Sequence, residues 1–448
     1  MSSIYNILDY GAVADGITNN AAAIQQAIDA ASVKSGQVFV PAGTFLSGTI
    51  RLKSNIDFHL SAGAVLLCSC NEKDILSFRG LYGPEEEVWS GGCFLFAYHA
   101  HNITISGEGT IQGQGNKLFI DDLADGDFHE CPLNIAPFRP RTTFLEDVTD
   151  LKIKDITIRD AASWSLHMAG CRRVMVHNIK ILNNHRGANN DGIDPDCCKD
   201  VIISNCLVET GDDAIVVKTT QLMTKKYGTS ENIVVSNCIL TSRDSGVKIG
   251  TETHGDIRNI IISNCVMKNC SRGIGIWARD GGKISDIYIH HITGNVLKYA
   301  DAIHRTKGPA RWWGVGEPVF INATYRNESK VFPGTIKNIT VDSMNLKAES
   351  SIFVGGEADT VIEDITMRNM NIVLCKQGTQ PHVFFDELPS IRKVYPHTIP
   401  VVYARYVNGL EVTGRVTYCE PYNPTENPIS EEEFCENVIV KLHSNVHL

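Results

Sequence analysis

A short apolar pattern recurs along most of the chain. Each copy alternates apolar, mainly β-branched residues with others and then continues into Ser, Asn or Asp, as in Val201-Ile202-Ile203-Ser204-Asn205. The last apolar residue of consecutive copies falls at Ile153, Val176, Ile203, Val235, Ile262 and Ile289. The steps between these anchors are 23, 27, 32, 27 and 27 residues, and a step of 52 residues then leads to Val341. Alternation with period two indicates β-strands, and the regular spacing indicates a structural repeat.

Strands this short cannot bury an apolar face on their own. Stacked as successive coils of a solenoid, each strand covers its neighbour and the core becomes continuous. The sequence therefore predicts an all-β fold, a right-handed parallel β-helix, in a single domain spanning residues 1–448. The step from Ile289 to Val341 fits either two coils or one coil with a long loop.

The two ends of the chain depart from the repeat. Residues 15–32 favour a helix with Asn19 or Asn20 as its N-cap, and Ile24 and Ile28 form a narrow apolar face. This helix is expected to cap the open end of the solenoid, where unpaired strand edges promote aggregation. Residues 377–448 are expected to form C-terminal coils and loops.

Composition and charge narrow the range of partners. The 448 residues are 43% hydrophobic and 21% charged, which is typical of a globular protein. A net charge of −10 without a basic stripe argues against a nucleic-acid partner. Since no apolar run approaches the roughly 20 residues of a membrane span, we expect no membrane partner. The sequence leaves the oligomeric state open.

The 14 cysteines are predicted to be free thiols. The start of the chain, Met1-Ser2-Ser3-Ile4-Tyr5, has no basic or apolar leader, so we expect a cytoplasmic protein in a reducing compartment. The motif Ser-Asn-Cys ends at Cys206, Cys238 and Cys265, just after three consecutive anchors. We expect these cysteines to stack inside the core and the Asn and Ser residues to form tight corners.

Two acidic segments stand out against this background: Asn189-Asn190-Asp191 and Gly211-Asp212-Asp213. Asp191 and Asp213 are 22 residues apart, about one coil, so the three carboxylates are expected to share one patch. Carboxylates that close raise the pKa of at least one of them, which gives an acid beside a base at neutral pH. Hydrolysis of a glycosidic bond needs that pair. The alternative for any single corner Asp is a turn-capping role.

At these residues the chain resembles family 28 of the glycoside hydrolases, the polygalacturonase family. The two acidic segments resemble its Asn-x-Asp and Gly-Asp-Asp motifs, and further similar segments are residues 9–16, 41–45 and 246–252 and Tyr325. The resemblance implies an inverting mechanism in which Asp212 is the general acid, while Asp191 and Asp213 hold and deprotonate the attacking water. It implies a pectin-related oligosaccharide or polysaccharide, galacturonide-like or rhamnogalacturonan-like, as substrate, and no metal or cofactor.

Two segments depart from the family's pattern. Arg243-Asp244-Ser245 stands where the family has Gly-His-Gly, and Gly275-Ile276-Trp277 stands where it has the Arg-Ile-Lys that grips the substrate carboxylate. Arg and Lys hold carboxylates best, whereas Trp stacks on an apolar sugar face. We expect substrate contacts from Asn189, Asp194, Lys248, His254, Trp277, Arg279 and Tyr325.

Two other functions remain open. A calcium-dependent polysaccharide lyase would use Asp191, Asp194 and Asp196 as oxygen ligands. A non-catalytic carbohydrate-binding β-helix would explain the missing His, Arg and Lys.

The segment 298–318, with Trp312-Trp313, is long for a corner and is expected to shape a sugar subsite.

Overall fold

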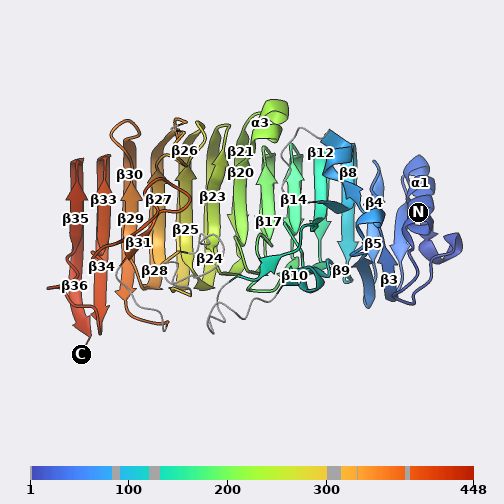
Figure 1. Ribbon diagram of the computed structural model, residues 1–448, viewed down its shortest axis with the longest axis horizontal. Coiled ribbons are helices and arrows are strands. Elements are labelled where there is room, and N and C mark those ends of the chain that lie inside the picture. The colour runs from blue at the N-terminus through green and yellow to red at the C-terminus, as the bar shows by residue number, and fades with distance from the viewer. Residues whose placement is uncertain are drawn as a thin grey trace. The chain divides into compact units, whose positions relative to one another are not determined.

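The computed structural model describes residues 3–82, 91–120, 132–299, 314–329, 331–378 and 384–447 (Figure 1). Part of the segment expected to shape a sugar subsite, residues 300–313, lies outside these ranges. The chain forms two compact units, the first ending at Asp212 and the second beginning at Asp213. Each is all-β and forms right-handed parallel β-helix, as predicted. The prediction of one domain for residues 1–448 stays a prediction.

The first unit begins with a short strand, a 3₁₀ helix and helix α1 (Ala21–Lys34), and continues in coils. Its helices are α1 (Ala21–Lys34), α2 (Phe78–Tyr82) and the 3₁₀ helices η1 (Ile7–Tyr10), η2 (Glu72–Asp74) and η3 (Gly115–Lys117). Its strands are β1 (Ile4–Asn6), β2 (Gln37–Val40), β3 (Gly43–Ser47), β4 (Ile50–Arg51), β5 (Ile56–Leu60), β6 (Ala64–Cys68), β7 (Leu76–Ser77), β8 (Gly92–Gly107), β9 (Thr110–Gln112), β10 (Phe119–Ile120), β11 (Asn134–Ile135), β12 (Pro140–Lys154), β13 (Thr157–Arg159), β14 (Leu166–Ala169), β15 (Arg172–His177), β16 (Lys180–Leu182), β17 (Ile193–Asp196), β18 (Lys199–Ser204) and β19 (Leu207–Thr210).

The second unit continues the same repeat. It contains the helix α3 (Gln221–Tyr227) and the strands β20 (Ile215–Thr219), β21 (Ser230–Ser236), β22 (Ile239–Ser242), β23 (Ser245–Thr253), β24 (Ile257–Cys270), β25 (Arg272–Ala278), β26 (Lys283–Val296), β27 (Glu317–Ala323), β28 (Thr335–Ala348), β29 (Ile352–Gly355), β30 (Ile362–Leu374), β31 (Phe384–Asp386), β32 (Val394–Pro396), β33 (Val402–Arg405), β34 (Val407–Cys419), β35 (Ser430–Glu433) and β36 (Glu436–His447).

The predicted anchors occupy equivalent positions in consecutive coils. In the first unit Ile153 pairs with Val176 and Val176 with Ile203. In the second unit Val235 pairs with Ile262, Ile262 with Ile289 and Ile289 with Val341. The 52-residue step therefore spans one coil with a long connection rather than two coils. All seven side chains are at most 1% exposed, so they form the core of their units.

Asn residues stand at corners of the coils, as predicted, and the structure shows that they adopt the left-handed conformation. Asn205, Asn237 and Asn264 have φ of 58°, 57° and 54°, a conformation that Asn tolerates because its short side chain bonds locally. The cysteines that follow them are buried, as predicted, and in the second unit Cys238 and Cys265 are neighbours. The cysteines of the described residues are free thiols. A hydrogen bond with Cys238 and burial both raise the pKa of Cys265, so this thiol stays protonated.

The N-terminal helix overlaps the predicted region, residues 15–32, but starts six residues later and ends two residues later. Helix α1 begins at Ala21 because Asp15 accepts the N–H groups of Ile17 and Thr18, which makes a turn of the residues before it. Ile24 and Ile28 are fully buried, and the helix packs on β1, β2, β4 and β5 at the N-terminal end of the first unit (Figure 1).

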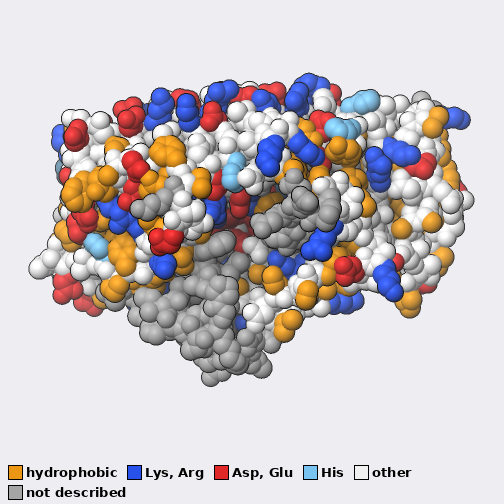
Figure 2. Space-filling view, turned by 45° about the horizontal axis from the view of Figure 1, so that its top comes forward, with side chains coloured by type: hydrophobic (Ala, Val, Ile, Leu, Met, Phe, Trp, Pro, Cys, Tyr) orange, Lys and Arg blue, Asp and Glu red, His pale blue; other side chains and the backbone are white. Residues whose placement is uncertain are grey.

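Acidic and basic side chains lie next to one another over the face drawn in Figure 2. Within the described ranges, no helix has the length and apolar character needed to cross a bilayer.

Substitution of two neighbouring residues of β24 tests which face of this strand forms the core. Ile262 is fully buried and Ile261 is 41% exposed. We expect Ile262→Ala to lower the free energy of unfolding by about 2–5 kcal/mol, because it leaves a cavity between paired coils. Ile261→Ala should change it by only about 0.5 kcal/mol. Urea unfolding followed by fluorescence measures both, and equal losses for the two variants would contradict the assignment of the inward face.

Candidate active site

Asp191 and Asp212, two of the three aspartates predicted to be catalytic, lie together in the first unit. Asp191 stands two residues before β17, and Asp212 follows β19 by two residues. Each offers a carboxylate oxygen within 4.8 Å of the other's. The side chains are largely buried, at 2% and 6% exposure. Two carboxylates this close repel one another, so the surrounding chain has to hold them in place.

Asn190 and Gly211 fix the backbone on which the two acids stand. Asn190 Nδ2 donates to the carbonyl of Asn184 at 2.8 Å, and its Oδ1 accepts the N–H of Gly211 at 2.8 Å. A Cβ at Gly211 would lie 2.5 Å from the carbonyl oxygen of Gly187, so close packing excludes a side chain here. Asn190 was not among the predicted site residues, although its position inside the Asn-x-Asp motif was a signal.

Asn189, predicted to contact substrate, instead bonds to an acid. Its backbone N–H donates to Asp212 Oδ2 at 3.1 Å, and its side-chain Nδ2 lies 3.5 Å from the same oxygen. Arg139, 3% exposed, donates to Asn189 Oδ1 at 3.3 Å and to the carbonyls of Ala162 and Ala188. Asn189 thus orients Asp212. Arg139 stands 50 residues earlier in the chain, and no sequence signal pointed to it.

Asp213 begins the second unit, where its carboxylate is paired with a buried cation. Lys248 Nζ lies 2.9 Å from Asp213 Oδ2 and 3.4 Å from Asp244 Oδ2. The N–H of Ser245 donates to Asp213 Oδ1 at 3.3 Å. Lys248 was expected to contact substrate, but it is 4% exposed and its charge is shared by two carboxylates of its own unit.

Trp277 is folded into the interior of the second unit and presents no open face for a sugar. It is 1% exposed, its ring centroid lies 4.9 Å from that of Phe320, and Lys248 Nζ lies 4.7 Å from the ring. A Cβ at Gly275 would lie 2.1 Å from the indole. The Gly and the Trp that stand in place of the family's Arg and Lys therefore depend on each other, because the indole of Trp277 fills the space that a side chain at Gly275 would occupy.

Arg272 is a second buried cation of this unit, and it lies beside Asp244, which also pairs with Lys248. It is fully buried, with Nη2 3.3 Å from Glu317 Oε1 and Nη1 3.7 Å from Asp244 Oδ1, and it donates to the carbonyl of Asp386. Burial opposes its charge, but Glu317, Asp386 and Asp244 outweigh that effect and hold the pKa of Arg272 above its ordinary value. Burial raises the pKa of the Asp386 carboxyl to about 7.

Arg279, also expected to contact substrate, ties distant segments together. It is fully buried and donates to the carbonyls of Ala278, Asn322 and Pro389. Burial lowers its pKa to about 9. Because backbone carbonyls accept the hydrogen bonds of this guanidinium, Arg279 holds segments of the fold together and is not placed to bind a uronate.

His254 and Tyr325 belong to two further clusters of the second unit. His254 Nε2 lies 3.8 Å from Asp280 Oδ2, and the same carboxylate pairs with Arg326 at 2.7 Å. The Tyr325 hydroxyl donates to Asp359, and this bond raises the pKa of Tyr325. These contacts connect the two side chains to Asp280 and Asp359 rather than to Asp213.

Asp194, the remaining predicted contact, lies in a buried cluster around Arg141. Asp194 and Asp196 are fully buried, and their charges favour the protonated form of Arg141, whereas burial lowers its pKa to about 10. Arg141 donates to His167 Nδ1, so Nε2 carries the proton and faces Asp196 Oδ2 at 3.3 Å. Of the three carboxylates expected to bind calcium in a lyase, Asp196 thus faces the His167 ring, and Asp194 and Asp196 both lie close enough to Arg141 to stabilise its charge.

His397, Glu431 and Glu433 form a group of metal-binding residue types in the second unit. They bring one nitrogen and two oxygens within 4.8 Å of one another. His397 Nε2 already pairs with Glu431 at 3.5 Å.

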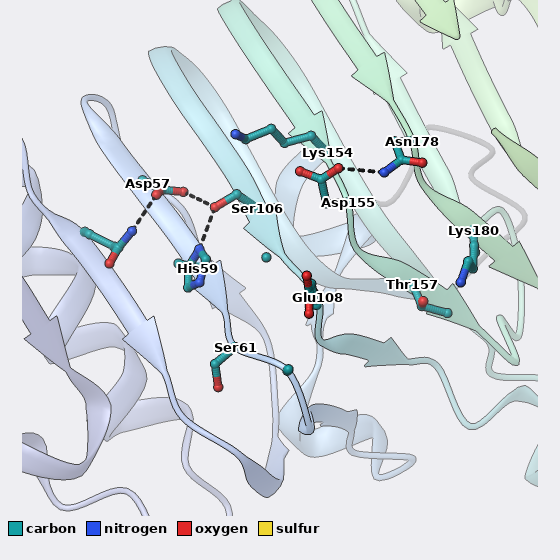
Figure 3. A pocket seen from close by; sticks show the side chains of 13 residues that line it. Asp57, His59, Ser61, Ser106, Glu108, Lys154, Asp155, Thr157, Asn178 and Lys180 are labelled. Atoms are coloured by element: carbon teal, nitrogen blue, oxygen red, sulfur yellow. Dashed lines mark hydrogen bonds between the residues drawn. The ribbon is translucent and has the colours of Figure 1, made fainter. Parts of the chain in front are cut away.

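A separate hollow of about 840 Å³ opens on the first unit (Figure 3). Its side chains come from β2, β5, β8, β12, β13 and β16 and the corners between strands, and they include Asp57, His59 and Ser106. Ser106 Oγ donates to Asp57 Oδ1 at 2.6 Å, so His59 Nδ1, 2.9 Å away, donates to the hydroxyl. The imidazole thus donates to the serine and does not accept its proton, while Asp57 accepts hydrogen bonds from both Ser106 and Gln37, so the group is a chain of hydrogen-bonded polar side chains along the strands.

The comparisons with known proteins agree with the acidic motifs. The family model described as Glycosyl hydrolases family 28 matches residues 30–306, more than half of the chain. The chain is 31% identical over 222 residues to a probable polygalacturonase of Vitis vinifera, which covers 48% of this chain and 44% of that protein. The match thus spans less than half the length of this relative.

Two solved structures have a similar fold. The family 28 exopolygalacturonase of Yersinia enterocolitica has a TM-score of 0.67 at 20% identity, covering 98% of this chain and 78% of that one. A hyperthermoactive exopolygalacturonase of Thermotoga maritima has a TM-score of 0.64 at 22% identity, covering 84% of this chain and 88% of that one. At these identities the structural similarity establishes the fold, and the match to the family model identifies the family. The chain therefore belongs to family 28 of the glycosyl hydrolases.

Proposed function

We propose that this protein hydrolyses a glycosidic bond in a pectin-related, galacturonide-like or rhamnogalacturonan-like oligosaccharide or polysaccharide. The observation that carries the proposal is the buried pair Asp191 and Asp212, whose carboxylate oxygens approach within 4.8 Å in a member of this family. The polygalacturonase names of its relatives support the class of substrate.

The proposed mechanism gives each aspartate one role. Asp212, protonated, donates its proton to the leaving glycosidic oxygen as the bond to the anomeric carbon breaks. Asp191 and Asp213 hold a water molecule and take its proton as the water oxygen bonds to that carbon from the opposite face, which inverts the configuration. Asn189 and Arg139 keep Asp212 in place throughout.

We further propose that the substrates are oligosaccharides inside the cell. The free thiols of the described cysteines support a reducing compartment such as the cytoplasm. A uronate at the reaction centre would have to be held by groups other than Trp277 and Arg279, because the first is buried and the second is used by backbone carbonyls.

A non-catalytic carbohydrate-binding role is the second candidate. The pairing of Asp213 with Lys248 favours it, because a carboxylate held by an ammonium is a weaker base. Binding of oligosaccharides without release of reducing ends would establish that role and exclude hydrolysis.

Replacing the proposed general acid tests the function directly. Asp212→Asn should lower kcat on oligogalacturonides by about 10²–10⁴-fold, because the amide cannot protonate the leaving oxygen. Release of reducing ends measures this loss. The matched control is Asp200→Asn, at an exposed corner of the same unit, which should keep wild-type activity. Full activity in Asp212→Asn would refute the assigned role.

The stereochemistry tests the proposed water activation. Inverting enzymes usually separate their carboxyl groups by about 6.5–9.5 Å and retaining enzymes by about 5–5.5 Å. The nearest oxygens of Asp191 and Asp212 are within 4.8 Å, so distance alone does not favour inversion. We expect the first product seen by ¹H NMR to carry the inverted anomeric configuration. A product with retained configuration would mean that one aspartate attacks the sugar instead of a water.

A further inference from the structure

Lys248 lies in a closed, charged environment beside one of the proposed catalytic groups. It projects from β23 towards Asp213 and Asp244, at 2.9 and 3.4 Å, and its ammonium lies 4.7 Å from the ring of Trp277. Trp277 occupies the space above Gly275, the residue that pairs with Lys248 in the next coil. The lysine therefore faces two carboxylates and an indole.

The partners of Lys248 are themselves held in place. Asp244 Oδ1 accepts the Ser245 hydroxyl at 3.1 Å and lies 3.7 Å from Arg272 Nη1. Arg272 is fixed in turn by Glu317 and by the carbonyl of Asp386. A lysine in such a rigid setting is poorly suited to follow a mobile substrate, and well suited to fix the carboxylate beside it.

We propose that Lys248 is a positioning residue for Asp213, which it holds ionised and oriented towards the attacking water. The Asp244 carboxylate pairs with the same ammonium and so weakens the effect of Lys248 on Asp213. This inference rests on the proposed hydrolysis. A cation at 2.9 Å favours the charged form of a buried carboxylate, and a second carboxylate on the same cation weakens that effect. The motif that departs from the family's Gly-His-Gly thus supplies a device that tunes the base.

Other charged groups surround this cluster and stay unchanged in the test. Glu317 and Asp386 lie behind Arg272, and Lys218 of β20 faces Glu252 of β23 at 3.9 Å. Asp212 precedes Asp213 in the chain, and in the first unit it faces Asp191. These groups are present in the wild type and in each variant, so the substitutions at Lys248 and Asp244 are the only changes of charge between the proteins.

The inference predicts opposite effects for two substitutions. The activity of an enzyme that needs an ionised base rises with pH through the pKa of that base. Lys248→Met should raise the pKa of Asp213, move the acid limb of kcat/KM upward by about one pH unit and lower kcat by about tenfold, with little change in KM. Asp244→Asn should move the same limb downward. Lys248→Arg, which keeps the charge, should leave the limb near its wild-type position.

Kinetics on oligogalacturonides between pH 4 and 8 decide the matter, with the exposed Lys283→Met as the control. Acid limbs at the wild-type position in both Lys248→Met and Asp244→Asn would overturn the inference and leave the proposed hydrolysis standing. A rise in KM alone for Lys248→Met would overturn it as well, because it would show that the lysine binds the substrate.

A readout without turnover separates this inference from the proposed function. In Lys248→Met the folded-state pKa of Asp213 should exceed its unfolded value of about 3.9, so the stability gained by protonation is lost as pH rises through the higher pKa. The Tm deficit relative to wild type should then be larger at pH 8 than at pH 5, and Asp244→Asn in the same chain should narrow it. Equal deficits at both pH values would overturn the inference, even if the wild type cleaves no substrate offered.

Discussion

In-register pairing between parallel strands of consecutive coils is the constraint on which the rest of this structure depends. Every paired coil presents its inward residues directly over those of its neighbour, as with Val235, Ile262 and Ile289. A shift of one residue would turn Ile262 outward and Ile261 inward, because side chains alternate along a strand. Burial of the inward row therefore fixes the register, and the register fixes which residues meet.

Extra residues must leave the coil at its corners. The 27-residue step from Ile262 to Ile289 and the 52-residue step from Ile289 to Val341 end in the same register, because the additional chain lies between strands. Corners are also where side chains escape the strict alternation of a strand. Asp191 before β17 and Asp212 after β19 both stand there, which lets two acidic groups of the first unit approach without entering the core row.

Buried charge is neutralised locally in each unit. Asn189 and Arg139 support Asp212 in the first unit, and Lys248 and Arg272 serve Asp213, Asp244 and Glu317 in the second. Isolated buried charges are costly, so such partners are a condition for placing acids in a dry site. Gly275 and Trp277 belong to the same arrangement, since the indole covers the glycine and packs against both cations.

The sequence by itself determined the repeat, the anchors, the burial of the three cysteines, the Asn corners and the approach of Asp191 to Asp212. These features follow from period and residue type, because a residue one coil away is a neighbour in space. Only the tertiary structure decided the surroundings of Lys248, Trp277 and Arg279. Arg279 bonds to Pro389, 110 residues later, and Arg139 bonds to Asn189, 50 residues later, and no period in the sequence encodes such pairs. The direction of a corner side chain depends on which distant segment fills the space beside it, and that packing exists only in the folded chain.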